Sequence, residues 1–290
     1  MIVVLCAIAL VVLPVLWAAI PGEIANWHQA AALEAYLEGD LTAAISHMDD
    51  AIARDSSDAK RFLTRVKYRR LNNDLSAALD DCNAALELNP QSVECYRERS
   101  HTLSMLGKFD EAISDSERIA ELPVEVPWWA RSFPYNKVSA LNGAAYFRAL
   151  KNAELDKALE EVQSAIEIYE SNNLEPSEGI LDTRGYIYYL RGELELARSD
   201  LDIAVRRVEG FYRAFYGAEG SVQHTLMDPS GDPLIDLREV ELKENEMAQT
   251  VAVLRYHRAL VLDNLGETDL AEADYNRIRE LGFKPNDKLF

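Results

Sequence analysis

The chain has 290 residues, and its 48% hydrophobic content is enough for a substantial core, which excludes a largely disordered polypeptide. Its 49 acidic residues outnumber its 30 basic residues, and the formal net charge of −19 disfavours general binding to nucleic-acid phosphates. With 13 Gly, 10 Pro and 3 Cys, the composition also excludes a collagen-like chain and a disulfide scaffold.

The amino terminus is strongly hydrophobic. Residues 2–20 carry no charged side chain and are numerous enough to cross a hydrocarbon core of about 30 Å as a helix. A basic start and a small-residue cleavage site, typical of a signal peptide, are both missing, so we expect residues 1–22 to be an uncleaved anchor. No Lys or Arg precedes Arg54, so we expect a single-pass membrane protein with its remaining chain on the extracytoplasmic side. The alternative is cleavage and release as a secreted or periplasmic protein.

An internal repeat follows this segment. The stretch GDLTAAISHMDDAI is the first of six related copies, whose first residues lie 34, 34, 46, 39 and 74 residues apart. The copies begin at Gly39, Asn73, Gly107, Ala153, Gly192 and Gly266. An alanine follows five residues later in every copy, at Ala44, Ala78, Ala112, Ala158, Ala197 and Ala271. A second small or aliphatic residue lies seven positions further on, which places both on one helical face that permits close packing.

Each copy begins at a residue suited to a left-handed turn, glycine in four cases and Asn73 in a fifth, whereas Ala153 fits least well. A second helical stretch precedes each turn. Two antiparallel helices per 34 residues resemble the tetratricopeptide repeat (TPR). The resemblance covers six repeats, at residues 25–58, 59–92, 93–126, 139–172, 178–211 and 252–285. It implies an all-α, right-handed superhelical solenoid after one hydrophobic helix, because each hairpin has apolar flanks that only its neighbours can cover.

Two segments interrupt the repeats. Residues 127–138 are rich in Pro and aromatic residues, and they either fold back onto the repeats or form an exposed aromatic binding site. Residues 212–251 separate repeats 139–211 from the last repeat, and we expect their ends to extend the flanking helices around a polar turn.

The chain lacks the motifs of common enzyme and metal sites. HExxH, CxxC, GxSxG and GxxxxGK[ST] are absent, and the five histidines have no metal-ligand spacing. We therefore expect no enzyme activity, no cofactor and no metal. Cys82 and Cys95 either pair outside the cytoplasm or are two buried small residues.

The TPR resemblance also implies a binding site. In TPR arrays the first helices of successive repeats line a concave groove, whose candidate binding residues here are Lys60, Lys67, Arg70, Arg97, His101, Phe147, Tyr186, Tyr189 and Tyr256. We expect a groove that is basic at one end and aromatic along the other, which suits an acidic peptide with apolar anchors. Alternatively, the basic helix is solvated and pairs with this protein's own carboxylates.

These observations predict a membrane-tethered, non-catalytic scaffold or adaptor that binds a protein or peptide, with no nucleic acid and no small-molecule substrate. One alternative is an exported soluble adaptor. The other is an accessory domain or an enzyme whose site uses the 212–250 insertion.

Overall fold

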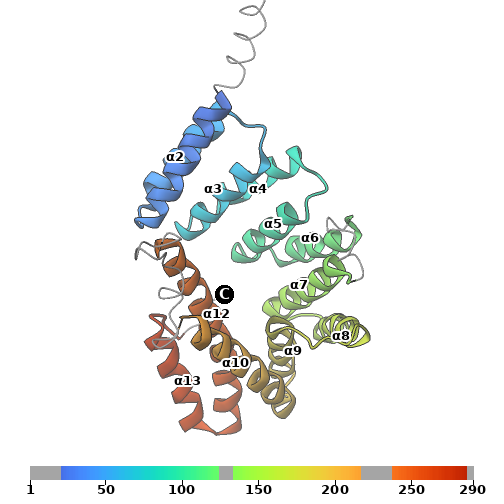
Figure 1. The fold of residues 1–290 in the computed structure, drawn as a ribbon. Helices are drawn as coiled ribbons and strands as arrows, with labels where there is room; N and C mark the ends of the chain where they lie inside the picture. Colours follow the sequence, from blue (N-terminus) through green and yellow to red (C-terminus); the bar gives the residue numbers. More distant parts are fainter. Residues whose placement is uncertain (1–20, 124–132, 217–236, 286–290) are drawn as a thin grey trace, which may run out of the picture. The chain divides into compact units, whose positions relative to one another are not determined.

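The computed structural model describes residues 21–123, 133–216 and 237–285, and all regular elements in these ranges are helices (Figure 1). The predicted hydrophobic helix of residues 2–20 lies outside them. No helix in the described ranges has the length and apolarity needed to cross a membrane. The chain divides into two compact units, unit 1 (Met1–Lys108) and unit 2 (Phe109–Phe290).

Unit 1 is built from helical hairpins. A helix of residues 21–37 is followed by α2 (Leu41–Arg54), α3 (Ala59–Leu71), α4 (Leu75–Leu88) and α5 (Val93–Met105). Several of these helices begin at a side-chain cap, because the first N–H groups of a helix have no partner within it. The Asp40 carboxylate accepts a hydrogen bond from the Ala43 N–H at 2.8 Å, and Asp58 and Ser92 cap α3 and α5 in the same way.

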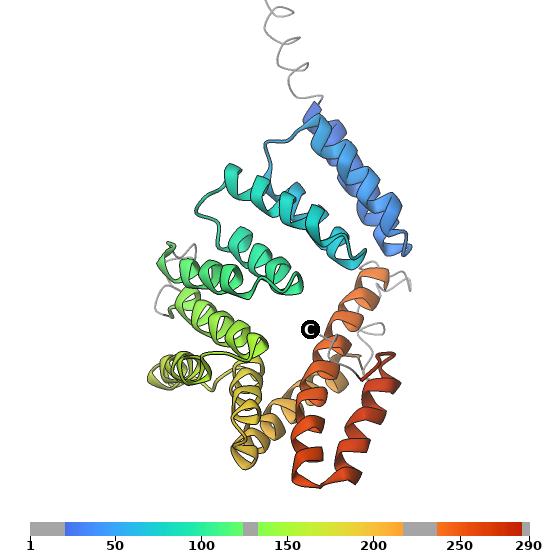
Figure 2. The same cartoon turned by 180° about the vertical axis from the view of Figure 1, so that it is seen from behind.

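Unit 2 continues with further hairpins. It contains α6 (Phe109–Glu121), α7 (Tyr135–Lys151), α8 (Leu155–Ser171), α9 (Glu178–Leu190), α10 (Leu194–Tyr216), α12 (Leu237–Leu265) and α13 (Thr268–Glu280). The pairs α7–α8, α9–α10 and α12–α13 pack as antiparallel hairpins, and α12–α13 is seen clearly from behind in Figure 2. The predicted helical extensions are present at both sides of the second interruption, since α10 has 23 residues and α12 has 29. The predicted polar turn between them lies outside the described residues.

The turns follow the predicted left-handed pattern in five of six hairpins. Positive φ angles occur at Gly39, Asn73, Gly107, Gly192 and Gly266. The sixth turn differs from the prediction, because Asn152 (φ 51°) and Glu154 (φ 53°) are left-handed instead of Ala153. Asn tolerates this conformation because its short polar side chain can hydrogen-bond locally. Alanine has a Cβ but no such polar group, so its backbone would be strained there.

The repeated small residues form the contacts between helices. All six register alanines, Ala44, Ala78, Ala112, Ala158, Ala197 and Ala271, are fully buried. Gly185 serves the same purpose on α9, because a Cβ added there would lie 2.7 Å from Leu201 Cγ of α10. Small side chains are therefore what allows the two helices of a hairpin to approach closely.

An arginine repeats at the centre of the hairpins. Arg65, Arg184 and Arg258 each lie on a first helix, and each binds the aspartate 16 residues later on its own second helix. The partners are Asp81, Asp200 and Asp274, which are 5% exposed or less. Each arginine also reaches the second helix of the preceding hairpin, where it contacts Asp49, Gln163 and Asp202 respectively. We call this arrangement the arginine bridge.

Two further expectations can be compared with the structure. Phe133 in the first interruption is buried and packs edge-on against Tyr169 at 5.0 Å, so this residue folds back onto the repeats, while Tyr135 is exposed. Trp128 and Trp129 lie outside the described residues. Cys82 and Cys95 are both buried and form no disulfide, in agreement with the second alternative for this pair.

Candidate functional site

Five of the predicted groove residues lie on α3 and α5 of unit 1, and we call Lys60, Lys67, Arg70, Arg97 and His101 the basic surface. The side chains of Lys60, Arg97 and His101 are exposed. Apolar side chains lie at the ends of the same two helices, where Leu71 is 54% exposed and Met105 is 45% exposed. The basic surface therefore offers positive charge beside exposed apolar area.

Part of this charge is used within the protein. The Arg70 guanidinium donates to the Glu98 carboxylate at 2.6 Å, and Lys67 Nζ lies 5.0 Å from the centre of the Tyr36 ring. Lys60 and Arg97 form no ion pair with the described residues. Within the basic surface, a partner can therefore neutralise these two cations without breaking an ion pair among the described residues.

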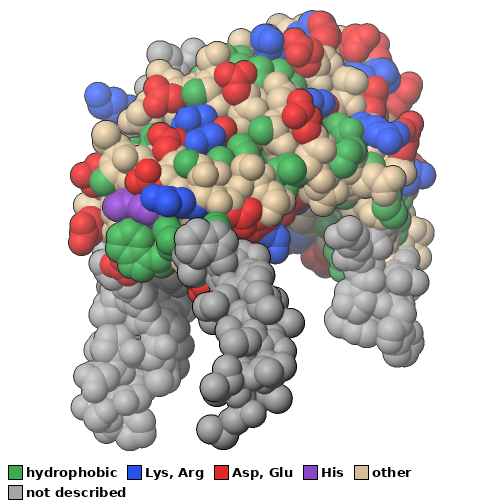
Figure 3. Space-filling view, turned by 90° about the horizontal axis from the view of Figure 1, so that it is seen from above, with side chains coloured by type: hydrophobic (Ala, Val, Ile, Leu, Met, Phe, Trp, Pro, Cys, Tyr) green, Lys and Arg blue, Asp and Glu red, His purple; other side chains and the backbone are tan. Residues whose placement is uncertain are grey.

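The remaining arginines of α3 stabilise the fold. Arg61 binds Asp55, while Arg65 and Arg69 both bind the buried carboxylate of Asp81. Pairing with this protein's own carboxylates, the alternative for the basic helix, is thus correct for these three arginines. On the face drawn in Figure 3, Lys and Arg side chains are interspersed with Asp and Glu side chains.

The aromatic residues of the predicted groove lie in unit 2, and we call Tyr186, Tyr189 and Tyr256 the aromatic surface. They project from α9 and α12 and are half-buried. The Tyr186 ring is nearly parallel to the Tyr189 ring, with 6.1 Å between their centres. Fixed aromatic side chains of this kind lose little conformational entropy when they bind a partner.

A buried polar pair holds the aromatic surface in place. His257 Nδ1 lies 2.7 Å from Asp182 Oδ1, and the His257 ring stacks on Tyr186 with 4.4 Å between centres. His257 has no exposed surface, so the pair positions Tyr186 and is not itself open to a partner. Burial raises the pKa of the Tyr186 hydroxyl above its ordinary value.

One predicted site residue is wrong. Phe147 is only 2% exposed, because α7 packs against α6, α8 and α9, so Phe147 is a packing residue and not a binding residue. Conversely, His257 and Asp182 are not among the residues predicted from the sequence. The available signal was Asp182 directly after the apolar residues Ile180 and Leu181, since buried polar groups require partners.

Comparisons with known proteins identify the fold. No protein-family model matches the chain. The TPR repeat-containing thioredoxin TDX of Arabidopsis thaliana is 31% identical over 91 residues, which are 31% of this chain and 24% of the relative. The chain spans 19 to 24% of the length of the curated relatives that it matches.

Two solved structures resemble most of the chain. One is a tetratricopeptide repeat protein from Parabacteroides merdae, with a TM-score of 0.51, 13% identity, and coverage of 90% of this chain and 94% of that protein. The other is PilF of Pseudomonas aeruginosa, with a TM-score of 0.51, 11% identity, and coverage of 90% and 93%. At these identities the likeness concerns the fold alone, and it confirms the predicted all-α TPR solenoid class.

Proposed function

We propose that this protein is a non-catalytic scaffold that binds an acidic segment with apolar anchors through its first-helix surfaces. TPR folds generally mediate protein–protein interaction, and no enzyme motif occurs in the chain. The observation that carries the proposal is the pair of exposed cations, Lys60 and Arg97, in a protein whose net charge is −19. The positive charge of this pair attracts acidic partners, whereas the net negative charge of the whole chain repels further copies of it.

The aromatic surface supports the apolar part of the proposal. Tyr and Trp are the residues most enriched among those that dominate binding energy at interfaces, especially where their surroundings hold them rigid. Tyr189 and Tyr256 are half-buried, so each combines a supported ring with accessible area. Each surface is proposed to contact the partner separately.

A peptide array tests the chemistry of the partner. Synthetic peptides of equal length vary in net charge and in the presence of a Leu or Phe anchor, and the purified full-length chain is incubated with them. We expect retention of acidic peptides with an anchor and weak retention of basic peptides. Equal retention of acidic and basic peptides would contradict the proposal.

Charge reversal then locates the site. Lys60→Glu combined with Arg97→Glu should weaken binding of a retained acidic peptide tenfold or more, equivalent to at least about 1.4 kcal/mol. The matched control is Lys137→Glu combined with Arg206→Glu, which changes the net charge equally at two exposed positions outside both surfaces. We avoid Arg70 because its reversal would also break the ion pair with Glu98.

The aromatic surface has its own pair of variants. Tyr189→Ala and Tyr256→Ala should each weaken peptide binding tenfold or more, whereas Leu270→Ala, at a side chain that is 51% exposed on α13, should not. Circular dichroism checks that every variant keeps its helicity. Unchanged binding by both tyrosine variants would remove the aromatic surface from the proposal.

We further propose that residues 2–20 tether this scaffold to a membrane, with the TPR units on the extracytoplasmic side. The support is their uncharged run of apolar residues and the lack of Lys or Arg before Arg54. After carbonate extraction of cells, the full-length chain should stay in the membrane pellet. In a separate experiment, protease added on the extracytoplasmic side of the intact membrane should digest it. Release into the supernatant would favour the exported soluble adaptor instead.

A further inference from the structure

The first hairpin lacks the arginine bridge. In each of the three hairpins with an arginine bridge, an arginine lies eight residues before the turn residue and an aspartate lies eight residues after it. Arg184 and Asp200 around Gly192 are an example. Around Gly39 the same positions hold Ala31 and His47. An imidazole thus replaces the carboxylate, and no guanidinium is present to meet it.

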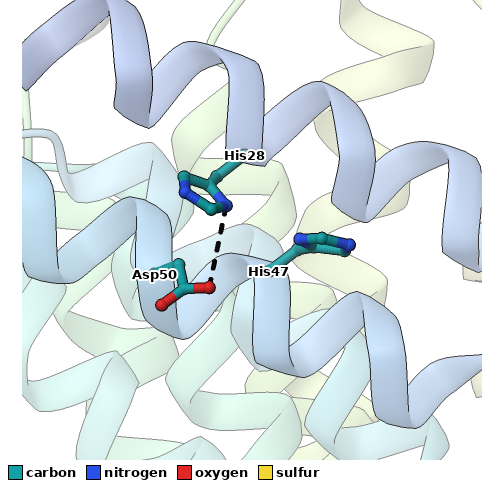
Figure 4. Close-up of side chains that lie close together, drawn as sticks. All are labelled: His28, His47 and Asp50. Carbon is teal, nitrogen blue, oxygen red and sulfur yellow. Dashed lines mark ion pairs between the residues drawn. The ribbon is translucent and has the colours of Figure 1, made fainter.

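Three potential metal ligands converge at this position. His28 on the helix of residues 21–37 and His47 and Asp50 on α2 each offer one ligand atom, and these atoms all lie within 4.8 Å of one another. Figure 4 shows His28 and Asp50 facing one another across the dashed line, with the ring of His47 beside them. His47 and Asp50 are three residues apart on one helix, which places both on the face that meets His28.

One nitrogen of each imidazole is unsatisfied among the described residues. Nδ1 of His28 and Nδ1 of His47 are both shielded from solvent and lack a hydrogen-bond partner. His28 Nδ1 lies 3.7 Å from Asp50 Oδ2, which is too long for a hydrogen bond. Buried polar atoms are nearly always satisfied, so two such nitrogens facing one carboxylate require an explanation.

We propose that His28, His47 and Asp50 bind one divalent transition-metal ion of the Zn²⁺ class. Neutral imidazole nitrogens and a carboxylate oxygen are the donors that Zn²⁺ accepts, at about 2.0–2.2 Å in tetrahedral geometry. Two such nitrogens lie about 3.3 Å apart around the ion, so the ligand atoms close on it by rotating about side-chain bonds. The ion supplies the positive charge that the arginine brings to the three hairpins with an arginine bridge.

The surroundings provide access and a fourth coordination position. Asp50 has an exposed side chain, and a shallow depression of about 490 Å³ lies beside the cluster, with Trp27, Ala31 and His47 in its lining. Water or an oxygen of a bound partner can complete the coordination from this depression, because three protein ligands leave one tetrahedral position open. The ion joins the helix of residues 21–37 to α2 and therefore stabilises this hairpin against opening.

A neighbouring tryptophan offers a direct signal. The Trp27 ring centre lies 4.8 Å from that of His28 and 6.2 Å from that of His47. Cu²⁺ binds imidazole sites more tightly than Zn²⁺ does, and it quenches the fluorescence of a nearby indole. Quenching of Trp27 by Cu²⁺ therefore reports binding to the same ligands.

The test uses the full-length chain purified without a polyhistidine tag. Competition with a chromophoric chelator should show one Zn²⁺ bound per chain, and Cu²⁺ should quench fluorescence with the same stoichiometry. Trp27→Phe should remove most of the quenching while Zn²⁺ binding remains. Zn²⁺ should also slow amide hydrogen exchange in residues 21–54, the segment that the ion joins.

Ligand variants decide the outcome. His28→Ala and His47→Ala should each weaken Zn²⁺ binding tenfold or more, while His101→Ala, at an exposed histidine on α5, should leave it unchanged. Asp50→Asn keeps the shape of an exposed side chain, so its weaker binding cannot be attributed to misfolding. The proposal is overturned by the absence of stoichiometric binding, or by binding that survives both His28→Ala and His47→Ala.

Discussion

Gly185→Ala is the most discriminating test of how the hairpins pack. An alanine in a helix interior is normally more favourable than glycine by about 0.8–1.0 kcal/mol. At Gly185, however, the new Cβ would lie 2.7 Å from Leu201 Cγ and 3.3 Å from the Ala197 carbonyl oxygen. Leu201 is fully buried, and its Cγ is the branch point of the side chain, so it cannot move aside freely.

The magnitude follows from these opposing effects. Overpacking of a buried site costs about 1–3 kcal/mol, so after the gain in helix propensity the net destabilisation at Gly185 is about 0–2 kcal/mol. Gly210 is the matched control, because it lies within α10 and an added Cβ meets no atom within 4 Å. Gly210→Ala should therefore stabilise by about 0.5–1 kcal/mol, so the two variants should differ by about 0.5–3 kcal/mol.

Hydrogen exchange of peptides from α9 and α10 measures the effect, because it reports local opening without requiring two-state unfolding of the whole chain. Leu201→Ala alone should cost about 2–5 kcal/mol through the cavity that it leaves. In the double variant the new Cβ occupies part of that cavity, so the two effects should be less than additive by about 1–3 kcal/mol. Additive effects, or a stabilising Gly185→Ala, would refute the close approach of α9 and α10.

Three further predictions concern unit 1. Hydrogen bonds from the Ser57 hydroxyl, the Ser57 N–H and the Arg61 side chain lower the pKa of Asp55 to about 2 from 3.8. The Asp55 carboxylate stabilises the fold fully above pH 3.8, and this stabilisation is lost as the pH falls through about 2. In Asp55→Asn the midpoint of urea unfolding should therefore depend less on pH between about pH 4 and pH 2 than it does in the unmodified chain. Burial raises the pKa of Cys82 to about 11, and iodoacetamide at pH 8 should modify this thiol in urea but not in the native chain, as peptide mass spectrometry would show. Asn73 has φ 62°, so Asn73→Ala should destabilise by about 1 kcal/mol while Asn73→Gly should not, and equal urea midpoints would contradict this.

Much of the fold could be predicted because the determining features are local and repeated. The alanines at Ala44, Ala78 and their counterparts recur in one register, and close helix contact is the physical requirement that they satisfy. The turn near Ala153 could not be located exactly. There the choice depends on which residue best tolerates a left-handed backbone, and Asn152 does so better than the register position.

The candidate site was less accessible to sequence reasoning. Phe147 occupies a groove position in the repeat register, yet packing of α7 against three other helices buries it. His28 and His47 are 19 residues apart in the chain, a spacing that matches no metal motif. Only the antiparallel return of α2 along the preceding helix brings their nitrogens to face one carboxylate.

Because each arginine bridge reaches back to the preceding hairpin, the loss of helices from one end of unit 2 affects the bridges differently from their loss at the other end. In unit 2, detachment of α12 and α13 would remove Arg258 together with Asp274 and leave every contact of Arg184 intact. Detachment of α7 and α8 would instead take Gln163 away from Arg184 and leave that half-buried cation with fewer acceptors. Peeling from the carboxyl-terminal end therefore leaves Arg184 with all of its acceptors, whereas loss of α7 and α8 leaves it with the Asp200 carboxylate and without Gln163.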